Sequence, residues 1–310
     1  MKLLCATDLL PKSEPAVERA GWLAADLGAD LSLLHVVAPI ASERVLEQEL
    51  QLAIAHLEAR VRPPLWKHGG TPRVLIRTGI PVRLILETIE ELKAQLLILG
   101  PHRRRTLRDA LEGTIASKVL AERKCPVLIV RKEPRRAYAN VLLALDLSAY
   151  ALAAVRAVES LELPGSAELT ILHAFDPPYQ GVLRYAGVEM GSLRTYAKGW
   201  KDEATTALRD LLKYESRDFA RYGIHVEESR PVPAILRAVK EREPDLLVMG
   251  TSGKGRVHRA LLGSVATEVL HEMRCDVLVV PGLPRQQDAL SYAGSRRALR
   301  HIARAREEGR

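Results

Sequence analysis

The strongest constraint on this chain of 310 residues is an internal repeat. Five segments of the first half reappear in the same order in the second half, offset by 138 residues for two pairs and by 150 for three. The pairs are 3–9 with 141–147, 33–36 with 171–174, 97–100 with 247–250, 113–114 with 263–264, and 124–130 with 274–280. The repeat therefore predicts two copies of one domain rather than two unrelated domains.

Each copy alternates short apolar runs with stretches of helical spacing. The runs are continuous, which is typical of strands buried on both faces, and in the first copy they lie at 3–7, 31–37, 73–77, 95–100 and 126–131. Helical spacing follows at 13–27 and again after Pro81. Because parallel strands need crossover helices, we predict an α/β fold: two doubly wound, Rossmann-like domains in tandem, each with a parallel five-stranded sheet.

The expected boundaries follow from the same pattern. We expect one domain at 1–134, a second at 138–284 and a basic C-terminal extension at 285–310, with the charged, proline-bearing segment 131–139 as the linker.

Composition narrows the class of protein. Apolar residues make up 47% and charged residues 27%, as in soluble globular proteins, and 4% aromatics are too few for a base-stacking platform. No apolar stretch of about 18 residues occurs, and the first eight residues lack the pattern of a secretory signal, so we expect a cytoplasmic protein with no membrane contact. The widely spaced Cys5, Cys125 and Cys275 predict buried thiols, and they exclude a disulfide framework.

The formal net charge of +8 is concentrated at one end. Residues 285–310 hold seven arginines against three acidic residues, so this tail alone carries 7 − 3 = +4. A frayed basic extension is the simpler interpretation, and docking on another subunit or an anionic polymer is the alternative. We expect no nucleic-acid binding except through this tail.

A glycine pattern follows the fourth predicted strand of the second half. Gly250, Gly253 and Gly263 are spaced G-x2-G-x9-G, and Ser264 precedes a predicted helix at 265–272. Glycines let backbone amides approach a phosphate without a Cβ clash, and a helix start favours an anion. The pattern therefore indicates a phosphate-binding loop.

This glycine pattern, with Asp146 closing the first strand of its repeat, resembles the universal stress protein family in its tandem form, over about residues 1–283. The resemblance implies an adenine nucleotide alpha hydrolase-like fold and, in one branch, bound ATP. It implies that Asp146 and the backbone at Ala174 hold the nucleoside, while the loop and Ser264 hold the phosphates. The implied cofactor-binding set is Asp146, Ala174, Met249, Gly250, Gly253, Gly263, Ser264 and Val265.

The resemblance also implies how the parts assemble. Mg or Mn would be held through phosphate oxygens, because no carboxylate cluster is evident and we assign no metal-ligating residue. The two repeats would form an internal pseudo-dimer in which the strands 126–131 and 276–281 meet. A homodimer of whole chains stays open.

The first half departs from this pattern. Arg103 stands where the second glycine belongs, and Pro101 removes a backbone donor. We therefore expect weak nucleotide binding or none there, although Asp8, Val36 and Ile115 match. The alternative is that the arginine side chains of residues 103–105 bind the phosphate.

Several residues allow two interpretations. His35 and His173 end matching strands, and hydrogen-bonded structural histidines are favoured over a metal or proton-transfer role. Asp8 and Asp146 are either ligand contacts or helix-capping acids. The segment 177–200 is either a plain surface helix, which we favour, or a lid over a pocket.

No catalytic motif appears: there is no G-x-S-x-G elbow, H-E-x-x-H, Walker A motif or paired-carboxylate spacing. We assign no catalytic residue, although slow ATP hydrolysis stays open. The predicted function is an ATP-binding sensor or regulator of a stress response. The alternatives are an interaction module that binds no nucleotide, and a binder of another, apolar ligand under 177–200.

Overall fold

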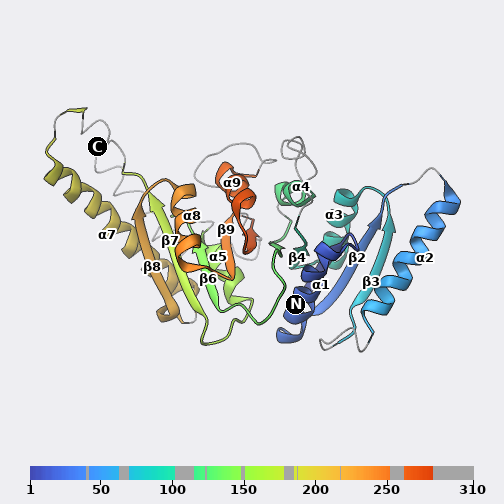
Figure 1. Ribbon diagram of the computed structural model, residues 1–310. Helices are drawn as coiled ribbons and strands as arrows, with labels where there is room; N and C mark the ends of the chain where they lie inside the picture. Colours follow the sequence, from blue (N-terminus) through green and yellow to red (C-terminus); the bar gives the residue numbers. More distant parts are fainter. Residues whose placement is uncertain are drawn as a thin grey trace.

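The two repeats form one continuous sheet with helices on both faces (Figure 1). The computed structural model describes residues 1–39, 42–62, 70–101, 115–122, 124–147, 151–177, 185–186, 188–216, 218–251 and 262–281. The α/β class and the tandem arrangement are thus confirmed, and the two five-stranded sheets join into a single ten-stranded one.

The first repeat contains five parallel strands in the order β3-β2-β1-β4-β5. These strands are β1 (Lys2–Thr7), β2 (Asp30–Val37), β3 (Arg73–Thr78), β4 (Leu96–Leu99) and β5 (Val127–Ile129). The helices are α1 (Glu14–Asp26), α2 (Glu43–Arg60), α3 (Pro81–Leu92) and α4 (Ile115–Glu122), and a 3-10 turn, Pro11–Ser13, precedes α1. Each strand begins and ends within two residues of the apolar run that predicted it.

The second repeat follows the same plan, in the order β8-β7-β6-β9-β10. Its strands are β6 (Asn140–Ala144), β7 (Glu168–Phe175), β8 (Tyr222–Glu228), β9 (Leu246–Gly250) and β10 (Asp276–Val280). Its helices are α5 (Ala151–Glu159), α7 (Met190–Glu215), α8 (Pro231–Arg242) and α9 (Ser264–Glu272), with a 3-10 turn, Phe219–Arg221, before β8.

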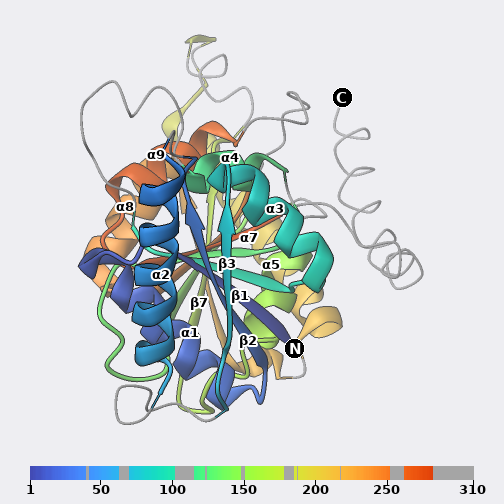
Figure 2. The same cartoon turned by 90° about the vertical axis from the view of Figure 1, so that its right-hand side faces the viewer.

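The repeats join through their last strands. β5 and β10 pair antiparallel, with Leu128 opposite Leu278. Figure 1 and Figure 2 show α4 and α9 side by side over this junction, while α2 and α7 lie at the two far ends. The pairing makes the sheet continuous from β3 to β8.

Two layers of helices enclose the sheet, and each layer covers an apolar core. Successive strand residues face opposite sides, so Leu3 and Cys5 belong to the core covered by α1, α2, α5 and α7, while Leu4 belongs to the core covered by α3, α4, α8 and α9. Figure 2 shows α2 and α3 on opposite sides of the first repeat's strands. Both cores contain side chains from both repeats.

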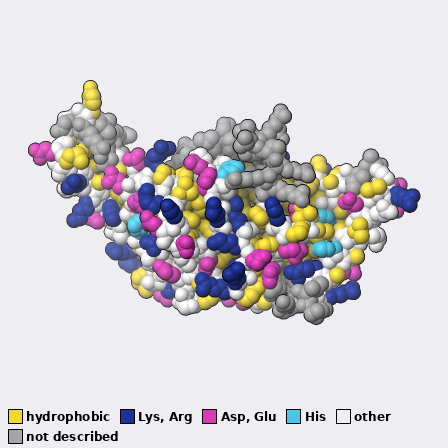
Figure 3. Space-filling view, viewed as in Figure 1, with side chains coloured by type: hydrophobic (Ala, Val, Ile, Leu, Met, Phe, Trp, Pro, Cys, Tyr) yellow, Lys and Arg dark blue, Asp and Glu magenta, His cyan; other side chains and the backbone are white. Residues whose placement is uncertain are grey.

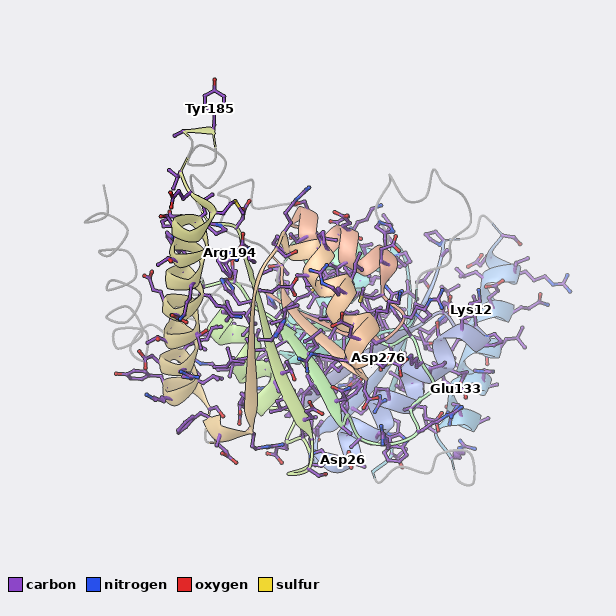
Figure 4. The ribbon with its side chains drawn as sticks, turned by 60° about the vertical axis from the view of Figure 1, so that its left-hand side comes forward. Lys12, Asp26, Glu133, Tyr185, Arg194 and Asp276 are labelled. Atoms are coloured by element: carbon purple, nitrogen blue, oxygen red, sulfur yellow. The ribbon has the colours of Figure 1, made fainter. Side chains whose placement is uncertain are left out.

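A buried polar cluster fixes the linker to β10. Asp276 is 1% exposed and accepts hydrogen bonds from the Tyr138 hydroxyl (2.6 Å) and from the backbone amides of Arg131 (2.7 Å) and Lys132 (3.2 Å). The guanidinium of Arg19 on α1 lies 3.7 Å from this carboxylate and 4.0 Å from the centre of the Tyr138 ring. Asp276, labelled in Figure 4, therefore connects elements of both repeats.

The segment 177–200 enters a long helix. α7 has 26 residues, against 18 in α2, its counterpart in the first repeat. A helix, the favoured interpretation, is present from Met190 onward, and Leu193 and Ala197 are buried on it. Tyr185 is 96% exposed and stands away from the body of the molecule in Figure 4. Residues 178–184 and 187 lie outside the described residues, so a lid there stays a prediction.

Candidate functional site

The strand register brings three predicted site residues to one edge of the second repeat. β6 lies between β7 and β9, with Ala144 paired to both Leu172 and Met249. Continuing this register by two residues places Asp146, just beyond β6, level with Ala174 on β7 and one residue past Gly250, where β9 ends. In open α/β sheets, ligands bind beyond the carboxyl ends of strands at this kind of position.

The start of α9 is fixed against the same edge. The Gly263 amide donates to the Thr251 carbonyl (2.9 Å), and the Thr251 amide donates to the Val280 carbonyl (3.0 Å). Gly263 is the N-cap of α9, and Ser264 begins the helix, one residue earlier than predicted. Ser264 is exposed, and the first-turn amides of a helix, which have no partner within the helix, favour an anion.

The remaining predicted site residues have different surroundings. Met249 is 3% exposed and its side chain packs in the core, so only its backbone is available to a ligand. Val265 is half-buried in the first turn of α9. Gly253 lies in 252–261, outside the described residues, and so does Arg103 of the first repeat. Their roles stay predictions.

The matched histidines hold the ends of matched strands together. His35 Nδ1 lies 2.9 Å from the Thr7 carbonyl oxygen, and His173 Nδ1 lies 2.8 Å from the Leu145 carbonyl oxygen. Because a carbonyl only accepts, Nδ1 carries the proton in both rings. The interpretation as hydrogen-bonded histidines is confirmed. In the described part of the chain, no group of three or more His, Cys, Asp or Glu side chains could hold a metal ion.

The matching aspartate of the first repeat is Asp8, directly after the end of β1. Asp8 Oδ1 accepts hydrogen bonds from Ser13 Oγ (2.6 Å) and from the Leu10 amide (3.1 Å), so this carboxylate does hold the turn that leads into α1. Ser13 also packs on Gly100, where an added Cβ would lie 2.9 Å from Ser13 Oγ. At the offset of 138, Ala151 replaces Ser13. Residue 151 therefore cannot donate to Asp146 the hydroxyl bond that Ser13 donates to Asp8.

Sequence reasoning missed the difference between Ser13 and Ala151, and it missed Thr251. The repeat alignment carried the signal for the first, because Ala151 stands at the same offset as Asp146. The burial of Thr251, 1% exposed, depends on packing that the alignment does not contain.

Charged side chains of both signs lie on the visible face of the molecule (Figure 3). Basic and acidic side chains are interspersed over the face shown in Figure 3, in the part of the molecule drawn in colour. Within the described ranges, no helix is long and apolar enough to cross a membrane.

Fold and site together define a tandem Rossmann-like α/β protein with a helix start at the carboxyl edge of its second repeat. The chain belongs to the universal stress protein family, whose model matches residues 1–131 and 137–281.

Relatives of known name support this membership. A universal stress protein of Mycolicibacterium smegmatis is 24% identical over 300 residues, covering 90% of this chain and 96% of that protein. One of Methanocaldococcus jannaschii is 31% identical over 144 residues, covering 46% of this chain and 82% of that protein. The first of these similarities therefore spans both repeats of the chain.

Solved structures show the same fold. The crystal structure of a universal stress protein from Archaeoglobus fulgidus superposes with a TM-score of 0.66 at 21% identity, covering 91% of this chain and 98% of that chain. A functionally unknown protein from Pseudomonas aeruginosa matches with a TM-score of 0.59 at 18% identity, covering 96% and 97%.

Proposed function

We propose that this universal stress protein binds an adenine nucleotide, ATP, at the carboxyl edge of its second repeat. The observation that carries the proposal is the asymmetry between the repeats. In the first, Pro101 follows Gly100 and has no amide hydrogen to donate. In the second, Thr251 follows Gly250, and the Thr251 carbonyl accepts a hydrogen bond from the Gly263 amide at the start of α9.

The proposed contacts follow from the chemistry of this edge. Asp146 accepts hydrogen bonds from the nucleoside, and the backbone at Ala174 lines its other side. The glycine-flanked start of α9 and the Ser264 hydroxyl take the phosphate oxygens, because the orphan amides of a first turn and the helix dipole favour negative charge. Mg²⁺ or Mn²⁺ would be held through those phosphate oxygens, since Mg²⁺ usually binds through substrate phosphates and keeps several waters.

We infer that the nucleotide acts as a signal rather than as a substrate, so that the protein is a sensor or regulator of a stress response. A ligand that binds one conformation of a protein more tightly than another increases the population of that conformation. This population shift is the physical basis of a nucleotide-controlled switch. The antiparallel pairing of β5 and β10 supports an internal pseudo-dimer, in which a ligand on one repeat acts on a sheet shared with the other.

Isothermal titration with ATP tests this proposal on the full chain and on two matched variants. The parent binds one ATP per chain. Asp146→Ala weakens binding at least tenfold, because a hydrogen bond to a charged group contributes about 1.5–3 kcal/mol. Asp8→Ala, the same change at the offset of 138, leaves the ATP affinity unchanged.

Two results contradict the proposal. A parent that takes up no ATP, with or without MgCl₂, removes the nucleotide function. If Asp8→Ala loses ATP binding while Asp146→Ala keeps it, the site lies in the first repeat. Thermal melts of both variants show whether each still folds, and Gly253→Arg, which copies the first repeat's Arg103, is expected to lose ATP binding as well.

A further inference from the structure

Thr251 is a buried residue whose hydroxyl makes no hydrogen bond within the described part of the chain. The residue follows Gly250 at the end of β9 and is 1% exposed, and its Oγ1 has no hydrogen-bond partner among the described residues. Buried side-chain polar atoms in proteins are nearly always bonded, because an unmet hydroxyl has lost its water and gained nothing. An exception of this kind requires an explanation.

The surroundings of Thr251 place this hydroxyl under the start of α9. The Thr251 amide is held by the Val280 carbonyl (3.0 Å) and its carbonyl by the Gly263 amide (2.9 Å). The first bond continues the β9–β10 ladder, so Thr251 faces the same side as Met249, whose side chain packs in the core beneath α8 and α9. The hydroxyl therefore lies on the α9 side of the sheet, next to the N-cap of that helix.

Two comparisons within the chain set Thr251 apart. At the offset of 150, the first repeat has Pro101, which has neither a hydroxyl nor an amide hydrogen. Thr88 on α3 is also fully buried, but its hydroxyl donates to the Leu84 carbonyl at 2.6 Å. An unbonded hydroxyl is therefore not a general property of buried threonines in this protein, and this one occurs in the repeat with the proposed site.

We propose that Thr251 is a specificity-determining residue whose hydroxyl donates to the phosphate chain of the nucleotide, so that the second repeat distinguishes nucleotides from nucleosides. The inference rests on the proposed function. A phosphate oxygen at the start of α9 would be an acceptor beside the Thr251 hydroxyl. Among the described residues this hydroxyl makes no hydrogen bond that would have to be broken first. Hydrogen bonds to charged acceptors are about twice as strong as neutral ones, so the contact favours phosphate over a bare hydroxyl.

The test compares ATP and adenosine by isothermal titration on the full chain. Thr251→Val keeps the shape and removes the donor, and it weakens ATP binding about tenfold while adenosine binding is unchanged. Thr251→Ser restores the hydroxyl and binds ATP within about twofold of the parent. Thr88→Val, the matched control, removes a buried hydroxyl elsewhere and leaves both affinities unchanged.

Thermal melting without ligand gives an independent readout. Thr251→Val melts at or above the parent temperature, because it removes a hydroxyl that has no partner, whereas Thr88→Val does not gain stability. A variant that loses ATP affinity and keeps its melting temperature has lost a ligand contact, not its fold.

The remaining outcomes are distinct. If Thr251→Val binds ATP like the parent, or loses ATP and adenosine equally, the inference is wrong and the proposed nucleotide function stands. If Thr251→Ser is as weak as Thr251→Val, the shape of the side chain matters instead of the hydroxyl, and the inference is again wrong. If the parent binds no ATP, the proposed function itself fails.

Discussion

Tyr138 shows how single residues hold the repeats together. Its ring is 1% exposed and its hydroxyl donates to Asp276, which begins β10, while the Arg19 guanidinium lies over the ring. Burial and the neighbouring Asp276 carboxylate hold the pKa of Tyr138 well above its usual range. The tyrosine therefore stays protonated in the folded protein at pH values where the unfolded chain has ionised it.

Replacing Tyr138 by phenylalanine has a pH-dependent consequence. Between the unfolded pKa, about 10, and the higher folded pKa, the native state binds more protons than the unfolded state, so raising the pH lowers stability. Tyr138→Phe lacks this contribution. We expect it to lose about 2 kcal/mol at pH 7, from the missing bond to a carboxylate, and less as the pH rises above 10. Urea unfolding of both proteins at pH 7, 10 and 11 measures the difference, and a gap that grows with pH contradicts this account.

At the scale of elements, α7 depends on a narrow apolar stripe. Leu208 is fully buried in the core on the α1–α5 side of the sheet, whereas Tyr214, two turns on, is 67% exposed. Leu208→Ala leaves a cavity and is expected to cost about 2–5 kcal/mol. Tyr214→Ala, on the same helix, changes stability by less than about 0.5 kcal/mol. Urea unfolding ranks the two, and equal costs would mean that α7 does not support the core.

Elements were predictable where the signal is local. The apolar runs predicted the strands because a strand buried on both faces needs apolar side chains throughout, as in 126–131. The start of α7 at Met190 was not predictable, since no capping side chain marks it. The Asp276 cluster was equally hidden: its bond to Tyr138 spans 138 residues, and the first repeat has Pro126 at the matching place. At the site, the glycines and Asp146 were visible as motifs, whereas the burial of Thr251 arises only from packing.

At the scale of the whole molecule, the two repeats share one sheet and both apolar cores, which predicts that they unfold together. The cores include side chains such as Leu33 of the first repeat and Ile171 of the second in one connected cluster. Hydrogen exchange in increasing urea is expected to show β1 and β6 losing protection at the same concentration. Separate midpoints in the parent would contradict the shared core.

Replacing Asp276 tests the prediction that the two repeats unfold together. Asp276→Ala leaves the Arg19 guanidinium, whose side chain is 7% exposed, without its carboxylate, and such a loss costs about 3–5 kcal/mol. The linker amides of Arg131 and Lys132 lose an acceptor as well. The variant is therefore expected to unfold at lower urea, and β1 and β6 are expected to lose hydrogen-exchange protection at different urea concentrations.

ATP at 100 times its dissociation constant adds about 2.7 kcal/mol to the free energy of unfolding of the parent, and in a cooperative molecule both strands gain this protection. In Asp276→Ala we expect only β6 to gain it, because the proposed nucleotide site lies in the second repeat and the junction no longer transmits the gain. Equal gains in both strands of the variant would show that the β5–β10 pairing alone couples the repeats.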